Sequence, residues 1–300
     1  MPPEWKKILY QKQSYPDNYV PDNFLSEMRQ NVDLKNYNYW ELSVQAGTLT
    51  QQISSITIFV SVFWNSYQGH LSGKALIMMT AVLVVVGYVC WAAVLGESGA
   101  AKRQLTIVKG GLIIFSLLFG LSPILTTLTK TISSDTIWAL TLVMFLTNLL
   151  FHEYEGDHFE GIAFPESLSI NAAISASVLL ASRLSSELMV FGIVSLALVL
   201  FGLFPLFRRC LRRWERKTWK VPGRPVELVL TIAMGSLSIG LLAPISMIPT
   251  TVYGCSALFI VFVCPYWLIW NQRFKNEIRG PWDEAKIQLE HTDHGPGASR

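Results

Sequence analysis

Long apolar runs separated by short polar segments dominate the hydrophobic pattern of this chain. A helix needs about 20 mostly apolar residues to cross a bilayer, and eight runs come close to this length. They cover residues 44–64, 75–95, 107–128, 136–152, 167–183, 187–207, 226–247 and 250–270. The pattern therefore predicts an all-α, polytopic membrane helical bundle with about eight transmembrane helices.

The first run is the least apolar of the eight, because polar side chains interrupt it. They are Gln45, Gln51, Gln52, Ser54 and Ser55. In the fifth run, Ala173, Ser177 and Ala181 recur at every fourth position. Small residues at this spacing let helices approach closely in lipid, so we expect this face to lie inside the bundle.

Three polar residues of the apolar runs are candidates for holding the bundle together. Asn171 is expected to bond to a neighbouring helix rather than to a ligand. Asp135 and Arg183 lie near the luminal ends of the fourth and fifth runs. An ion pair between them would fix the register of the two helices.

Polar segments divide the chain into three regions. We predict a cytosolic N-terminal segment over residues 1–43, a membrane domain over 44–270 and a cytosolic tail over 271–300. The N-terminal segment has apolar residues at helical spacing, which predict a short amphipathic helix on the membrane surface or on a partner. These residues are Phe24, Leu25, Met28 and Val32.

Basic residues give the orientation of the predicted bundle. Placing the N-terminus in the cytosol leaves 21 of the 24 lysines and arginines in cytosolic segments, with only Lys74, Lys130 and Arg183 outside. Cytosolic loops of membrane proteins carry this excess of positive charge. Only 15% of the residues are charged, whereas a soluble domain has about 25%. Charge and composition together predict a membrane domain with both termini in the cytosol.

The strongest charge feature is a predicted basic cytosolic loop over residues 208–225, directly after the sixth run. Its basic and aromatic side chains suit contact with anionic lipid headgroups. Specific binding of a phosphoinositide and the positive-inside pattern alone are the alternatives. The candidate contact residues are Arg208, Arg209, Arg212, Arg213 and Trp214. Nucleic acid is excluded as a partner, because the cluster lies against the bilayer.

Candidate catalytic and metal-binding chemistry is sparse. Residues 152–160 combine acidic and histidine side chains that suit a divalent cation, but their spacing fits no metal motif and a solvated loop accounts for them better. The sequence has no Asp-x-Asp, no two glutamates eight positions apart and no glycine-rich phosphate loop. Charged side chains are missing from the cores of the eight runs, and no catalytic residue, metal ligand or cofactor is predicted.

Several segments match a known family in the family's order and extend through nearly the whole chain. They are Trp5–Tyr10, Tyr15–Val20, Ser122–Thr129, Ser134–Ile137, Ser167–Ala172, Leu180–Leu184, Cys264–Pro265 and Gly280–Ala285. Each segment alone is weak evidence, but together they are specific. On these segments the chain resembles the phosphatidylinositol glycan class C family, whose members are a multi-pass component of phosphatidylinositol N-acetylglucosaminyltransferase.

The resemblance implies a function that composition does not show. The family's complex transfers N-acetylglucosamine from UDP-N-acetylglucosamine to phosphatidylinositol at the endoplasmic reticulum membrane, the first step of glycosylphosphatidylinositol anchor biosynthesis. A separate class A subunit carries out the chemistry, alongside subunits of classes H, P, Q and Y. This chain is then expected to be a non-catalytic membrane scaffold. The residues expected to contact partners or lipid on the cytosolic side also include Pro16, Asp17, Asn18, Tyr19, Gly280, Pro281, Trp282, Asp283 and Glu284.

The alternative function is a multi-pass transporter of lipids or small molecules. Such a protein is expected to carry charged residues inside its spans and interrupted helices in paired positions of an internal repeat. The sequence shows neither feature, so the interpretation as a component of the transferase is favoured.

Overall fold

The structure is a computed structural model, and its described residues fall into two units. The described residues are 12–16, 19, 29–30, 37–95, 113, 116, 120, 132–154, 166–218, 225–275 and 278–279. One unit covers residues 37–269, and the other combines residues 1–36 with residues 270–300.

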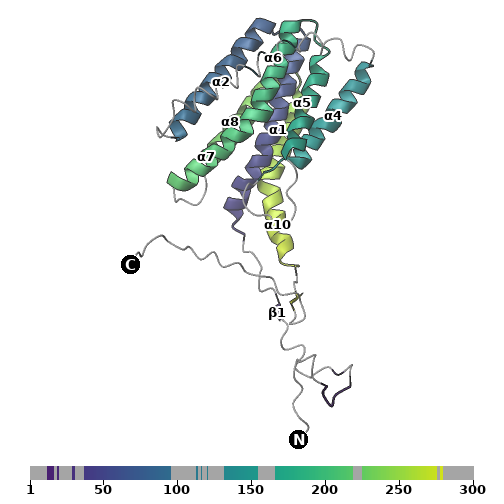
Figure 1. Ribbon diagram of the computed structural model, residues 1–300, viewed down its shortest axis with the longest axis vertical. Coiled ribbons are helices and arrows are strands. Elements are labelled where there is room, and N and C mark those ends of the chain that lie inside the picture. The colour runs from purple at the N-terminus through teal and green to yellow at the C-terminus, as the bar shows by residue number, and fades with distance from the viewer. Residues whose placement is uncertain are drawn as a thin grey trace. The chain divides into compact units, whose positions relative to one another are not determined.

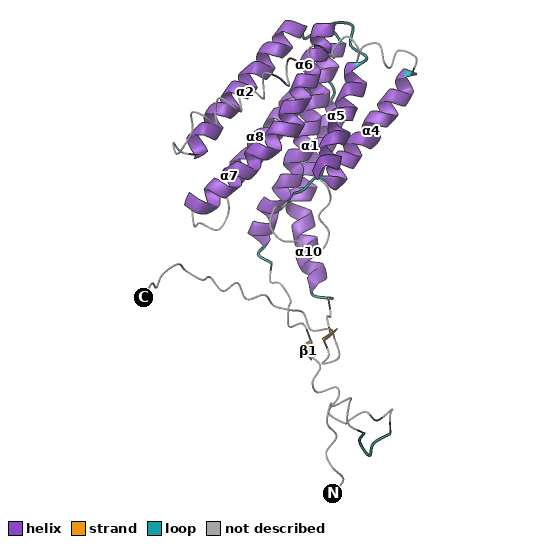
Figure 2. Ribbon diagram, in the orientation of Figure 1, coloured by secondary structure: helices purple, strands orange, loops and turns teal. Residues whose placement is uncertain are grey.

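The larger unit is a bundle of helices around α1, which runs from Tyr39 to Tyr67 (Figure 1). Helices also make up nearly all of its described residues (Figure 2). The further helices are α2 (Gly73–Leu95), α4 (Ser134–Phe151), α5 (Glu166–Ala181), α6 (Glu187–Ala197), α7 (Phe204–Thr218), α8 (Pro225–Leu242), α9 (Met247–Leu258) and α10 (Cys264–Gln272). Helix α1 packs along α8, α4 packs along α5, and α2 packs along α6.

Local sequence sets where the helices begin and end. The Trp40 amide donates to Asn38 Oδ1 at the start of α1 (3.0 Å), and the Thr136 amide donates to Ser133 Oγ at the start of α4 (3.3 Å). These side chains satisfy amides that have no partner within the helix. After α1, Gly69 has a φ of 79°, a left-handed conformation that glycine adopts without steric cost.

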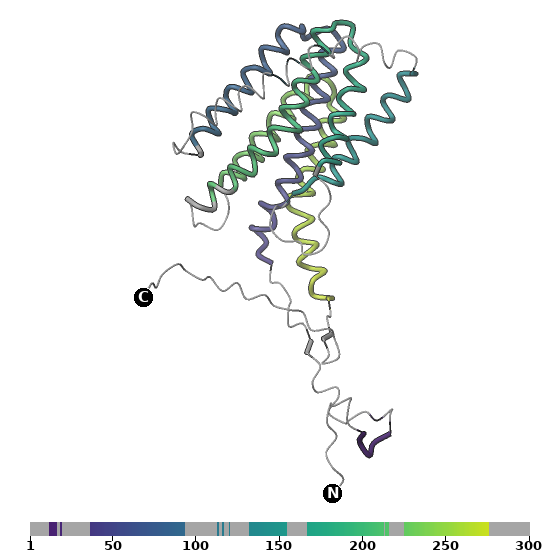
Figure 3. Tube along the Cα trace, in the orientation of Figure 1, coloured from purple at the N-terminus to yellow at the C-terminus, as the bar shows by residue number. Residues whose placement is uncertain are grey.

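Two long helices pass through short π-helical segments. Leu198–Leu203 joins α6 to α7, and Phe259–Val263 joins α9 to α10, with no break in the chain trace (Figure 3). Pro205 and Pro265 follow these segments closely. Each proline lacks an amide hydrogen, and its ring crowds the carbonyl one turn earlier. The wider π turn accommodates this crowding, so the helices continue past the prolines.

This continuity changes the predicted boundary of the membrane domain. The sequence predicts a sixth span that ends at residue 207, followed by a basic loop over 208–225. In the structure, α7 extends to Thr218, so residues 208–218 of this segment are helical rather than a loop. Arg208, Arg209 and Arg212 therefore belong to a helix that continues directly from α6.

Aromatic rings form the centre of the bundle core. Phe59 of α1, Phe145 of α4 and Phe201 of the first π-helical segment lie with ring centroids 5.8, 5.6 and 5.7 Å apart. Tilted and edge-to-face pairs at these separations are favourable. In α5, Ala173, Ser177 and Ala181 are all fully buried, which confirms the small-residue face predicted from their spacing.

Five described helices are long and apolar enough to cross a membrane. They are Gly73–Ala93, Ser134–Phe151, Glu187–Arg212, Pro225–Leu242 and Met247–Gln272. The apolar helix Ser167–Ala181 is shorter, and α1 coincides with the first predicted span. Of the predicted span 107–128, the structure describes only residues 113, 116 and 120. The membrane helical bundle is confirmed, whereas the number of eight spans and the cytosolic termini remain predictions.

The smaller unit contains a short pairing between the two ends of the chain. Strand β1 (Arg29–Gln30) pairs antiparallel with β2 (Ile278–Arg279). The amphipathic helix predicted around residues 24–32 is therefore wrong at Arg29 and Gln30, and its other residues lie outside the described ones. Helical spacing could not reveal this pairing, because the hydrogen-bond partners come from the opposite end of the sequence.

Candidate functional site

The polar residues that interrupt the first apolar run face the interior of the bundle. Gln51, Gln52 and Ser54 of α1 are all buried, with at most 1% of each residue exposed. Gln52 Nε2 donates to Asn148 Oδ1 of α4 (2.8 Å). Asn148 Nδ2 in turn donates to the hydroxyl (2.9 Å) and the carbonyl (3.0 Å) of Ser169 in α5. One amide pair thus joins three helices.

The same turn of α1 also bonds to the helices on its other side. Gln51 Nε2 donates to Thr231 Oγ1 of α8 (2.8 Å). The Ser54 hydroxyl bonds to Tyr253 OH of α9 (2.6 Å), and Ser238 Oγ of α8 donates to the Ser54 carbonyl (3.3 Å). We call these residues the polar hub: Gln51, Gln52, Ser54, Asn148, Ser169, Thr231, Ser238 and Tyr253. Interhelical hydrogen bonds of this kind help helices to associate where lipid supplies no hydrophobic force.

At one end of the polar hub lies a buried arginine of α7. Arg208 is only 2% exposed. Its Nη1 donates to Gln51 Oε1 and to the Thr48 carbonyl, both at 3.3 Å. Its Nη2 lies 2.7 Å from His152 Nε2, and because a guanidinium only donates, the histidine nitrogen accepts. The guanidinium carbon also lies 5.5 Å from the ring centroid of Phe204, a favourable cation–π distance.

Three arginines of α7 hold the three residues that follow α4. Arg208 binds His152 as above, Arg209 Nη2 donates to Glu153 Oε2 (3.0 Å), and Arg212 Nη1 donates to the Tyr154 carbonyl (2.7 Å). We call Arg208, Arg209 and Arg212 the arginine clamp, and His152–Tyr154 the strap. The contacts of Arg208 and Arg212 are buried charge-assisted hydrogen bonds, which are stronger than neutral ones, whereas the Arg209–Glu153 pair is partly exposed.

Burial, more than the charges of the clamp, shifts the pKa values of two strap residues. Burial, followed by the positive charges of Arg208, Arg209 and Arg212, lowers the pKa of His152 from 6.5 to about 3. His152 is therefore neutral at pH 7, as its acceptor role requires. Burial also raises the pKa of the Tyr154 hydroxyl above its ordinary value of 10.0, against the opposing effect of Arg208.

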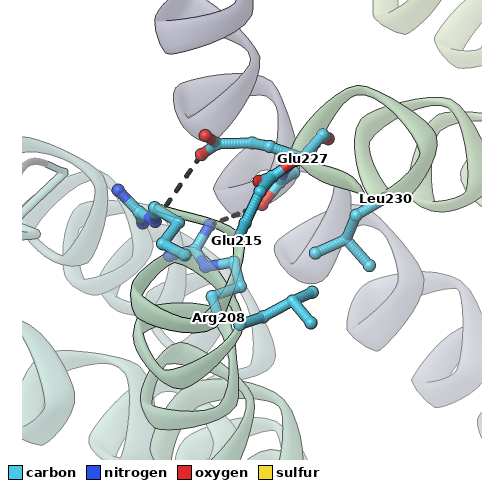
Figure 4. Close-up of a pocket in the computed structure, with 7 residues that line it drawn as sticks. Arg208, Glu215, Glu227 and Leu230 are labelled. Atoms are coloured by element: carbon cyan, nitrogen blue, oxygen red, sulfur yellow. Dashed lines mark hydrogen bonds and ion pairs between the residues drawn. The ribbon is translucent and has the colours of Figure 1, made fainter. Parts of the chain in front are cut away.

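Two buried glutamates lie beside the clamp, and one of them, Glu227, pairs with Arg212. Glu215 Oε1 accepts from the Val226 amide in the first turn of α8 (2.8 Å). Glu227 Oε1 lies 3.6 Å from Arg212 Nε. Figure 4 shows Arg208, Glu215 and Glu227 converging on a small cavity. The cavity has a volume of about 10 Å³, roughly what one water molecule needs, so it is too small for a sugar or a headgroup.

The structure separates the predicted basic contact residues into two kinds. Arg208 and Arg212 are buried and direct their donors into the protein, so both hold the bundle together in this conformation. The Arg209 side chain is 26% exposed, and Trp214 is half-buried. The side chain of Arg213 lies outside the described residues.

The terminal contact residues are only partly described. The Tyr19 amide donates to the Pro16 carbonyl (2.9 Å), and the rings of Tyr15 and Tyr19 lie 4.3 Å apart. Asp17, Asn18 and the residues from Gly280 to Glu284 lie outside the described residues. The partner or lipid contacts of these residues remain predictions.

The three residues predicted to hold the bundle together differ from expectation. Asn171 is exposed, and the interhelical amide bonds come from Asn148 instead. Asp135 is exposed in the first turn of α4, where a negative charge favours the helix N-terminus. Arg183 Nη2 donates to the carbonyl of Ile132 (2.6 Å). Arg183 therefore links the end of α5 to the segment before α4 through the main chain rather than through Asp135.

Sequence reasoning missed Asn148 and Glu227, and it singled out His152 only as part of the segment 152–160, which it interpreted as a solvated loop. The amide of Asn148 within an apolar run was a usable signal, because a polar group in lipid needs a partner. Glu227 offered no comparable signal, since it stands at a predicted span boundary. Among the described residues, no group of three or more histidine, cysteine or acidic side chains is placed to hold a metal ion.

Comparisons with known proteins match nearly the whole chain. The family model described as phosphatidylinositol N-acetylglucosaminyltransferase (GPI2) matches residues 5–283. The GPI2 subunit of that enzyme from Schizosaccharomyces pombe is 39% identical over 289 residues, which cover 95% of this chain and 87% of the relative. The corresponding C subunits from Mus musculus and Homo sapiens are 35% and 33% identical, each over 288 residues that cover 95% of this chain and 93% of the relative. No solved structure matches the chain.

Proposed function

Because this chain belongs to the GPI2 family of phosphatidylinositol N-acetylglucosaminyltransferase, we propose that it is a membrane subunit of such an enzyme. The reaction is transfer of N-acetylglucosamine from UDP-N-acetylglucosamine to phosphatidylinositol, the first step of glycosylphosphatidylinositol anchor biosynthesis. The observation that carries this proposal is the match of 95% of the chain to relatives that are named as subunits of the enzyme. Those names favour a role in the transferase over a transporter.

Within the complex, the chain acts as a scaffold rather than as the catalyst. The polar hub supports this role, because its hydrogen bonds join α1 directly to α4, α8 and α9 and, through Asn148, to α5. The arginine clamp supports it as well, because its buried charges are taken up by contacts within the bundle. A catalytic group must instead reach its substrate within hydrogen-bond distance. The sugar transfer is carried out by a class A glycosyltransferase subunit, and subunits of classes H, P, Q and Y are the other partners.

The chain resides in the endoplasmic reticulum membrane with both termini in the cytosol. The distribution of lysine and arginine supports this orientation. It places the strap, the clamp and both terminal segments on the side where UDP-N-acetylglucosamine is present. The terminal segments around Pro16–Tyr19 and Gly280–Glu284 then contact partner subunits.

Removal and return of the chain tests this function. Membranes from cells that lack the chain should transfer no labelled N-acetylglucosamine from UDP-N-acetylglucosamine to phosphatidylinositol, and re-expression of the chain should restore the transfer. Full activity in membranes without the chain would contradict the proposal. Sugar transfer by the purified chain alone would contradict the scaffold role while leaving the pathway assignment intact.

A further inference from the structure

One ion pair of the clamp stands apart from the others because it reaches the surface. Arg209 Nη2 and Glu153 Oε2 are 3.0 Å apart, and their side chains are 26% and 45% exposed. Arg208 and Arg212, in contrast, are only 2% and 9% exposed. The Arg209–Glu153 pair is therefore the part of the clamp that a molecule outside the bundle can reach.

The position of Glu153 is fixed by its two neighbours. His152 bonds to the buried Arg208 on one side, and the Tyr154 carbonyl accepts from Arg212 on the other. The main chain on both sides of Glu153 is thus held by buried contacts, and its carboxylate is presented to Arg209. A substitution of Glu153 removes its charge while these two anchors stay in place.

The location of Arg209 points to a lipid headgroup as the outside molecule. Leu206 and Arg209 are three positions apart on one helix face of α7, and Leu206 is 56% exposed, as is Leu203 one turn earlier at 44%. In a membrane this apolar face meets acyl chains, and Arg209 lies at its end. The candidate span begins at Glu187, and at 1.5 Å per residue Arg209 lies about 33 Å further along. This distance is close to the hydrocarbon thickness of about 30 Å, so the guanidinium reaches the level of the phosphates.

We propose that Arg209 binds the phosphate of an anionic phospholipid, and that Glu153 occupies the guanidinium when no such lipid is bound. An exposed ion pair of this kind is weak, whereas a guanidinium matches a phosphate with two parallel hydrogen bonds. The phosphate belongs either to the substrate phosphatidylinositol or to bulk anionic lipid. The inference rests on the chain spanning a membrane and is independent of the sugar-transfer function.

Lipid binding to the purified full-length chain tests this inference. Native mass spectrometry from a neutral detergent gives the apparent affinity for phosphatidylinositol, phosphatidylserine and phosphatidylcholine. Glu153→Gln should raise the affinity for anionic lipid about two- to fivefold, since it removes a weak competitor. Arg209→Gln should lower that affinity. The double variant with Arg209→Gln and Glu153→Gln should bind anionic lipid no more tightly than Arg209→Gln alone. Asp135→Asn, an equal charge change at the other end of α4, is the matched control and should have no effect.

The outcomes separate the possible ligands. An equal gain for phosphatidylinositol and phosphatidylserine identifies a general phosphate site, and a gain for phosphatidylinositol alone identifies the substrate headgroup; both support the proposal. An unchanged affinity in a Glu153→Gln variant with wild-type thermal stability would overturn it, as would a gain that persists in Arg209→Gln. Tighter retention of a partner protein with no change in lipid affinity would also overturn it and identify a protein contact. Since no sugar transfer is measured, failure here would not bear on the proposed function.

Discussion

Replacing Asn148 with leucine should lower the free energy of unfolding of the bundle by about 2 kcal/mol. The Asn148 side chain makes three hydrogen bonds, one to Gln52 and two to Ser169. Interhelical hydrogen bonds in membrane proteins average about 0.6 kcal/mol each, so their loss sums to about 2 kcal/mol. Leucine fills a similar volume, which keeps a cavity from adding to the loss.

Equilibrium unfolding of the purified chain in mixed micelles, followed by tryptophan fluorescence, measures this change. The matched control is Asn171→Leu, the same substitution at an exposed position of the neighbouring helix α5, and it should change stability by less than about 0.5 kcal/mol. Combining Gln52→Leu with Asn148→Leu should cost less than the sum of the two single changes, because both remove the same hydrogen bond. Wild-type stability of Asn148→Leu, or an equal loss in Asn171→Leu, would refute the interhelical role of this amide.

Three further predictions concern pH, packing and assembly. The pKa of His152 is about 3 in the folded chain and 6.5 when unfolded, so its contribution to stability is present above pH 6.5 and lost as pH falls. The free energy of unfolding should drop by about 2 kcal/mol between pH 7 and pH 5. In His152→Gln this part of the pH dependence should be missing. Gly47→Ala should destabilise the chain by about 1–3 kcal/mol, since a Cβ there would lie 2.8 Å from Thr231 Oγ1. Gly240→Ala, where an added Cβ meets nothing within 4 Å, should leave stability unchanged or raise it by up to about 1 kcal/mol in the same unfolding assay, because alanine is the better helix former. Trp282→Ala should loosen the complex without unfolding the bundle, and unchanged co-purification of the partner subunits would contradict that.

The first apolar run shows how far the sequence leads toward the fold. Its glutamines and serines mark it as unusual among the predicted spans, and the structure makes it the central helix α1. The sequence shows that a polar residue lies within a predicted helix, but it does not show which other helix that residue faces. The partners of Gln52 and Ser54 lie about 100 and 200 positions away, so only the packed structure reveals the polar hub.

The basic segment is a part of the membrane domain for which the prediction from sequence was wrong. Treating residues 208–225 as a loop made every charge in it a surface charge. Once the helix continues past Pro205, Arg208, Arg212 and Glu215 recur at i, i+4 and i+7, the spacing of a single helix face. That face turns inward, where the strap and Glu227 supply partners. The spacing was visible in the sequence, but the π-helical segment that carries the helix past the proline was not.

Affinity purification of the tagged chain in gentle detergent, followed by a sugar-transfer assay on the eluate, tests the central claim most directly. We expect a glycosyltransferase subunit to co-purify, and the eluate to transfer N-acetylglucosamine from UDP-N-acetylglucosamine to phosphatidylinositol. A well-folded chain that elutes without any partner and without activity would contradict its assignment as a working subunit of this enzyme.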